Sequence, residues 1–128
     1  MIFTITPLYA IPLILIYLVL WIRVTSARSH YNVSIGNSNN DELLLLIRQH
    51  GNCFEWASMN LIMMMLAEGH GASNLYLHIA GSLMLIGRVL HPFGLKINNA
   101  THILRIIGNS ANMLSVLACL IGLGLTFI

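Results

Sequence analysis

The polarity of this chain alternates between four long apolar stretches and three polar connections. Each stretch is close to the length of about 20 residues that a helix needs to cross the hydrocarbon core of a bilayer. Two connections are longer and one is a tight turn at residues 68–71, which favours antiparallel neighbours. The pattern predicts an all-α membrane protein, an antiparallel four-helix transmembrane bundle formed by a single domain over residues 1–128. The predicted spans cover about residues 7–22, 43–67, 72–90 and 101–127.

Composition supports a membrane location and excludes soluble classes. The 128 residues are 57% hydrophobic and only 8% charged, which is too little polar surface for a soluble domain. A net charge of +2 without a basic, aromatic-rich cluster excludes a nucleic-acid partner. Cys53 and Cys119 lie inside apolar stretches, so we interpret them as buried thiols rather than a disulfide. The first stretch lacks a positive n-region and is interpreted as a retained span rather than a signal peptide.

The basic residues lie on one side of the predicted bundle. All six are in or beside the longer connections, 23–42 and 93–100, and none flanks the opposite ends of the spans. By the positive-inside rule these connections face the cytoplasm and both termini lie outside it. Most charged residues that enter the spans are on the same side, where we expect a functional site. The six are Arg23, Arg28, Arg48, Arg88, Lys96 and Arg105.

A polar stripe crosses the second span. At 100° per residue, Arg48, Asn52 and Glu55 fall within about 60° of one another on a helix. A charged side chain at mid-membrane costs roughly 2.5–3.5 kcal/mol, so these residues must pair or line a wet cavity. Asn52 is placed to bridge Arg48 and Glu55, and an ion pair that only fixes packing is the alternative. His50 points about 200° away from Arg48, which suggests a subunit interface or a packing role.

The third and fourth spans add further polar groups at the basic side. Arg88 and His91 are three residues apart and share a helix face. Arg105 is followed on the same side by Asn109 and Asn112. Arg105 is either a snorkelling anchor or one of several guanidinium groups, with Arg28, Arg48 and Arg88, that converge on an anionic ligand. No metal site is predicted, because the histidines are scattered and lack paired ligand spacing.

Small residues recur three or four apart along the last span, which predicts close approach of a neighbouring helix. They are Gly108, Ala111, Ser115, Ala118 and Gly122.

Three motifs together resemble a known family. The stretch Arg48-Gln49-His50-Gly51-Asn52-Cys53-Phe54-Glu55-Trp56 resembles the R-x-H-x-N-x-x-E-Y signature of the MAPEG family, the membrane-associated proteins of eicosanoid and glutathione metabolism. Residues 87–91 resemble the family's G-R-x-x-H, and residues 105–108 resemble its R-x-x-G. Residues 33–43 look like the loop of bacterial members. The resemblance covers nearly the whole chain and keeps order and spacing.

The resemblance implies a homotrimer that binds glutathione between subunits at the cytoplasmic side of a bacterial inner membrane. It implies that Arg105 holds the glutathione thiolate, and that a lipophilic electrophile or hydroperoxide enters from the bilayer. One subunit would bind glutathione through Arg48, Asn52, Glu55 and His91, with Arg88 counted among the binding residues. The neighbouring subunit would contribute Arg28 and His50.

This chain departs from the family pattern at three positions. Trp56 and Leu95 stand where Tyr is usual in the family or its eicosanoid-type members, and Ser29 stands where some members have a second Arg. Three functions therefore stay open. The first is a membrane glutathione transferase or peroxidase. The second is a non-catalytic accessory subunit of a larger membrane complex, and the third is a protein that binds lipid headgroups or other anions through the arginine cluster.

Overall fold

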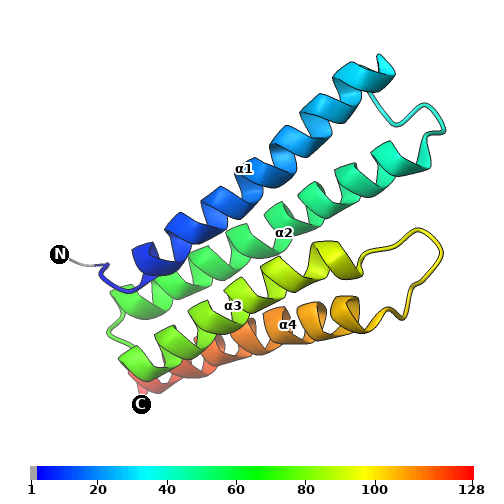
Figure 1. The fold of residues 1–128 in the computed structure, drawn as a ribbon. Helices are drawn as coiled ribbons and strands as arrows, with labels where there is room; N and C mark the ends of the chain where they lie inside the picture. The colour runs from blue at the N-terminus through cyan, green and yellow to red at the C-terminus, as the bar shows by residue number, and fades with distance from the viewer. Residues whose placement is uncertain (1–2) are drawn as a thin grey trace.

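The computed structural model describes residues 3–128 and confirms the antiparallel four-helix bundle (Figure 1). The two residues before them, which the domain prediction includes, lie outside the described residues. The chain runs up and down through four helices and closes with a 3₁₀ turn. These elements are α1 (Thr6–Tyr31), α2 (Asp41–Gly69), α3 (Asn74–Gly94), α4 (Ile103–Gly124) and η1 (Leu125–Phe127).

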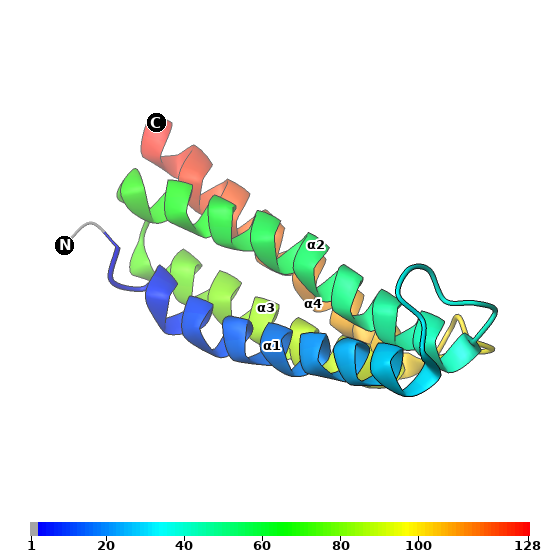
Figure 2. The same ribbon diagram turned by 90° about the horizontal axis from the view of Figure 1, so that it is seen from above.

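Both longer loops lie at one end of the bundle, and the start of α1 and the C-terminus lie at the other (Figures 1 and 2). Helices α2 and α3 each contact both α1 and α4. Within residues 3–128, α1 and α4 make no contact with each other, so they lie on opposite sides of the α2–α3 pair. The end with the two loops, called the basic end below, carries the chain's Lys and Arg residues, as the sequence predicts.

Helix α1 continues well past its apolar run. The connection predicted over 23–42 is helical to Tyr31, and the true loop is residues 32–40. The helix ends where Asn32 adopts a left-handed backbone (φ 53°) and the N–H groups of Asn32 and Val33 bond to the carbonyls of Ser29 and Arg28. The prediction was wrong here because hydropathy marks the lipid boundary, whereas a helix can continue into water.

Helix α3 also runs further than predicted. The His91-Pro92 pair does not stop it, and the helix ends at Gly94. Pro92 has no N–H to donate to the Arg88 carbonyl four residues earlier, so one helical hydrogen bond is lost, but the helix continues for two more residues. A Cβ at Gly94 would collide with the backbone nitrogen of Arg105, so the end of α3 lies directly against the first turn of α4.

The small residues of α4 form its buried face, as predicted. A second close approach between α3 and α4 is at Gly87 and Gly108. A Cβ on Gly87 would collide with the side-chain amide of Asn112 and lie 2.8 Å from the Gly108 carbonyl oxygen. Because little hydrophobic force drives helices together in lipid, this close backbone packing supplies much of the association.

The outer surface of the bundle is apolar. Large exposed side chains follow α1 and α4, among them Leu8, Ile11, Leu15, Leu117 and Leu120. Two segments, Thr6–Tyr31 and Ile103–Phe127, are long and apolar enough to cross a membrane by themselves. Helices α2 and α3 carry several of the buried polar side chains described below, Gln49, Asn60, Arg88 and His91.

At the end opposite the basic end, Glu68 fastens the start of α1 to the end of α2. Its carboxylate accepts the backbone N–H groups of Thr4, Ile5 (2.7 Å) and Thr6 (2.8 Å). The residue that precedes the helix, Ile5, offers no side-chain cap, so Glu68 satisfies donors that the helix N-terminus leaves free. Burial alone would raise the pKa of Glu68, but these donors outweigh it and lower the pKa from 4.5 to about 2.

Replacing Gly87 by Ala should separate α3 from α4 and destabilise the protein by about 1–3 kcal/mol, because the new methyl group meets Asn112 and backbone rather than a flexible side chain. Gly124→Ala is the matched control. Gly124 is the last residue of α4, and a methyl group added there would meet no atom within 4 Å, so this change should be neutral or slightly stabilising. Thermal unfolding in detergent measures both, and equal midpoints for the two variants would contradict the packing described.

Glu68→Gln should lower stability at neutral pH by about 1 kcal/mol, a modest value because the carboxylate is partly exposed to solvent. A depressed carboxyl pKa contributes stability above pH 4.5, and this contribution disappears as pH falls toward 2. The wild type should therefore lose its advantage over Glu68→Gln between these values. Unfolding midpoints of both proteins across that range provide the test, and a constant difference would rule out the proposed cap.

Candidate functional site

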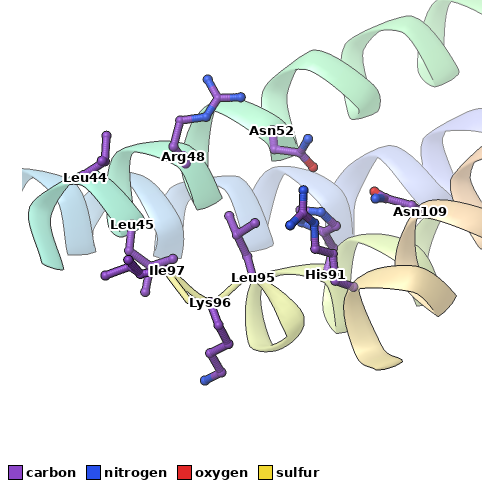
Figure 3. A pocket seen from close by; sticks show the side chains of 10 residues that line it. Leu44, Leu45, Arg48, Asn52, His91, Leu95, Lys96, Ile97 and Asn109 are labelled. Atoms are coloured by element: carbon purple, nitrogen blue, oxygen red, sulfur yellow. The ribbon is translucent and has the colours of Figure 1, made fainter. Parts of the chain in front are cut away.

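A cleft of about 270 Å³ opens between α2 and the α3–α4 pair at the basic end. Arg48 and Asn52 come from α2, His91 from the last turns of α3, and Arg105 and Asn109 from the first turns of α4 (Figure 3). Leucine and isoleucine side chains complete the wall. Lys96, in the 95–102 loop, also lines the cleft, and its ammonium end points away from the other labelled side chains in Figure 3. Four of the eight sequence-predicted residues, Arg48, Asn52, His91 and Arg105, are thus brought together, and no carboxylate lines the cleft in the described part of the chain.

Arg48 and Glu55 lie on the outward face of α2. Their closest atoms, Nη1 and Oε1, are 4.0 Å apart, and each side chain is 57% exposed. The pair is therefore loose, and both charges face whatever surrounds the subunit at this depth. In a membrane this exposure is costly unless another polar surface covers it.

Asn52 does not bridge these two charges, contrary to the prediction. Its side-chain oxygen and its carbonyl both accept from Nη1 of Arg88, at 2.9 and 3.0 Å. Nε of Arg88 donates to Oδ1 of Asn112 at 3.0 Å. Arg88 is 1% exposed, so a single guanidinium joins α2, α3 and α4 inside the bundle. Its Nη2 is a buried donor without a partner among residues 3–128.

Arg105 lies at the start of α4, where the tight packing against Gly94 fixes its backbone. Its side chain is half-buried and Nη1 donates to the Ala100 carbonyl at 3.3 Å. One guanidinium nitrogen therefore rests on the loop, while the group still lines the cleft. Asn109, one turn further along α4, lines the same wall.

His91 is 2% exposed and lines the cleft floor. Its Nδ1 is buried and has no hydrogen-bond partner within residues 3–128. Pro92, the next residue, has its carbonyl held at 2.7 Å by Nε2 of Gln49. The helix end that carries the imidazole is therefore held in place, and Nδ1 of His91 remains available to hydrogen-bond a ligand.

The predicted convergence of four guanidinium groups is wrong for a single subunit, because only Arg48 and Arg105 share the cleft. Arg88 is buried behind it. Arg28 is turned to its own loop, where Nη1 donates to the carbonyls of Val33, Ser34 and Gly36. His50 is on another face of α2 as predicted, with its ring 4.7 Å from that of Tyr17 on α1.

Sequence reasoning missed two buried polar connections. Gln49 is 5% exposed and joins α1 to α3, because its Oε1 accepts from Arg23 at 3.2 Å and its Nε2 donates to the Pro92 carbonyl at 2.7 Å. Near the middle of the bundle, Oγ of Ser115 lies 2.7 Å from the Ala80 carbonyl oxygen and 3.1 Å from Oδ1 of Asn60, and its one proton serves either acceptor. Helical phase points Gln49 and Asn60 inward, but it does not identify their partners.

Comparison with known proteins agrees with this architecture. The model of the MAPEG family matches residues 6–125, and the chain belongs to this family. Two curated relatives are each called "Inner membrane protein YecN", from Escherichia coli strain K12 and from strain CFT073 of serotype O6:H1. Each is 32% identical over 90 residues, which is 70% of this chain and 69% of the relative. No solved structure matches the chain.

The structure assigns different roles to two arginines, and stability measurements separate them. Arg88→Met should destabilise the protein by about 2–3 kcal/mol, because buried acceptors on Asn52 and Asn112 lose their donor. Arg105→Gln removes only one contact to a loop carbonyl and should change stability by less than about 0.5 kcal/mol. Unfolding midpoints in detergent test this, and an equally large loss for Arg105→Gln would show that both are structural.

Proposed function

We propose that this protein is a glutathione-dependent transferase or peroxidase of the bacterial inner membrane that works as a homotrimer. Family membership supports glutathione chemistry in general terms. The observation that carries the proposal is the cleft itself, which brings Arg48 and Arg105 together from different helices without a carboxylate between them. Three cationic side chains line the cleft, Arg48, Lys96 and Arg105, and such a cluster favours an anionic ligand.

Glutathione matches the cleft group by group. It is an anion with two carboxylates, one amine, two amide bonds and a thiol. Arg48 would bind a carboxylate, and the nearby Glu55 would take the amine. The amide side chains of Asn52 and Asn109 would serve the peptide groups, and the free Nδ1 of buried His91 would add a hydrogen bond.

A neighbouring subunit is needed to complete the site. The cleft of about 270 Å³ is slightly smaller than a usual ligand pocket of roughly 300–1,000 Å³, and it is open on one side. The exposed Arg48–Glu55 pair also needs a polar cover within the membrane. A trimer would meet both needs, with Arg28 and His50 of the neighbouring copy as the proposed contributors.

The chemistry would depend on the thiolate. A free thiol has a pKa near 8.5, so only a few per cent is ionised at pH 7. Lowering that pKa by about two units requires roughly 2.7 kcal/mol of preferential thiolate stabilisation, which Arg105 in a partly dry cleft would supply. The thiolate sulfur then attacks an electrophilic carbon, a C–S bond forms, and the leaving group departs with its electron pair. With a hydroperoxide, two glutathione molecules become the disulfide while the peroxide is reduced to alcohol and water.

The proposed orientation follows from charge. The basic end would face the cytoplasm, where glutathione is available, and both chain ends would lie on the other side. The relative's description as an inner membrane protein supports the membrane assignment. A lipophilic second substrate would enter from the surrounding bilayer.

One observation favours a second candidate, a non-catalytic accessory subunit of a larger membrane complex. Arg105 already donates to its own loop at Ala100, as an anchoring residue would. Trp56 and Leu95 also lack the phenol groups that the family pattern has at these positions. A protein that binds lipid headgroups or other anions in the same cleft is a third candidate, and both alternatives lack thiolate formation.

Arg105→Gln should raise the pKa of bound glutathione by about two units and so remove most of the thiolate absorbance that the wild type shows at pH 7. Ultraviolet difference spectra of the purified, intact oligomer with added glutathione measure this. Lys96→Gln is the matched control, because it removes one positive charge from the rim of the same cleft, at a side chain whose ammonium end points away from the other labelled side chains.

Two results would contradict the assignment. One is an intact wild-type oligomer that gives no glutathione-dependent thiolate signal, which would favour a non-catalytic role. The other is an equal loss of thiolate absorbance in Lys96→Gln and Arg105→Gln, which would show that Arg105 acts only through general surface charge.

A further inference from the structure

A second, separate groove lies between α1 and α3. It has a volume of about 310 Å³ and shares no lining residue with the cleft described above. Its walls are apolar and include Leu15 and Val19 of α1 and Val89 and Phe93 of α3. All four side chains are exposed, Phe93 to 65%, so the groove is open to the lipid along the side of the bundle. The buried Arg88 also borders it, but its hydrogen bonds run to α2 and α4.

An exposed cation stands at the basic end of this groove. Arg23 follows directly after the apolar run of α1 and lines the groove, so headgroups are expected at its level. Its Nη1 donates to Oε1 of Gln49 at 3.2 Å, and Gln49 is itself held by the Pro92 carbonyl at 2.7 Å. Gln49 is buried, so it acts as a fixed support for the arginine. Arg23 is therefore held at the groove mouth, whereas an ordinary snorkelling arginine moves freely.

Arg23 also lacks a neutralising partner. In the described residues the one ion pair within 4.0 Å joins Arg48 and Glu55. Glu42, which lines a surface hollow together with Arg23, accepts from Tyr31 instead. The guanidinium has five N–H donors and uses one on Gln49, so the others are free for an anion. An apolar groove that ends at a fixed, unpaired cation complements an anionic amphiphile.

From this geometry we infer that the α1–α3 groove is a binding site for an anionic phospholipid. One acyl chain lies along Leu15, Val19 and Val89, and the phosphate is bound by Arg23. Lipid tails gain little by moving from one apolar environment to another, so the walls select for shape and Arg23 selects for headgroup charge. This site does not depend on the proposed glutathione chemistry, since no residue is shared with the cleft.

The experiment uses delipidated full-length protein and native mass spectrometry. Dioleoyl phosphatidylglycerol and dioleoyl phosphatidylcholine are added separately, because they share acyl chains and differ in headgroup charge. The wild type should retain the anionic lipid preferentially. Arg23→Gln should weaken binding of the anionic lipid about fivefold, which is the usual contribution of one basic residue near an anionic headgroup. Binding of the zwitterionic lipid should not change.

Two further variants test the groove itself. Val89→Trp fills it and should remove the retained lipid, whereas Ile86→Trp, one turn earlier on α3 and equally exposed to lipid, should not. Lys96→Gln controls for loss of one charge at the same end of the bundle. Free phosphatidylglycerol headgroup, glycerol phosphate, should not compete, because it lacks the acyl chain.

Several outcomes would overturn the inference. Equal retention of the two lipids by the wild type would show that Arg23 does not select for headgroup charge. Equal effects of Arg23→Gln and Lys96→Gln on binding of the anionic lipid would show the same. Unchanged binding in Val89→Trp would place the lipid elsewhere. An intermolecular disulfide formed by Val89→Cys in the native oligomer would show that a second copy of the chain, and not lipid, covers the groove.

Discussion

The guanidinium of Arg88 is the interaction on which the rest of this bundle depends. It is buried in α3 and donates to Asn52 on α2 and to Asn112 on α4, so one side chain sets the spacing of three helices. The glycine contacts between α3 and α4 make room for Asn112 beside it. The cleft exists because these helices are held at this separation, with Arg48 and Arg105 at its edge. Arg88 thus belongs to the motif for a structural reason, although sequence reasoning grouped it with ligand-binding residues.

Much of the fold could be predicted from the sequence because membrane helices reveal themselves by local patterns. Four apolar stretches, the one-sided distribution of Arg and Lys, and the small-residue face of α4 all depend on residues close together in the chain. The ends of α1 and α3 could not be predicted, because polarity changes at Arg23 while backbone hydrogen bonding continues to Tyr31. Pro92 similarly suggests a break that the last turn of α3 absorbs.

The candidate site was predicted in part. Helical phase placed Arg48, Asn52 and Glu55 on one face, and the structure gives Arg48 and Glu55 an outward position there. The partner of Asn52 was missed because it comes from 36 residues away, and no local pattern encodes that contact. Gln49 was missed for the same reason, since its partners lie on two other helices. Long-range polar contacts decide which motif residues face a ligand and which support the fold.

Glutathione is proposed to bind in the cleft between α2 and the α3–α4 pair, at a boundary between subunits. The most direct test is a density map of the purified oligomer with glutathione added at saturating concentration. We expect ligand density within reach of both Arg48 and Arg105, with a second copy of the chain closing the open side. A well-resolved oligomer whose cleft contains only lipid, or whose Arg48–Glu55 face is covered by lipid alone, would refute this binding mode.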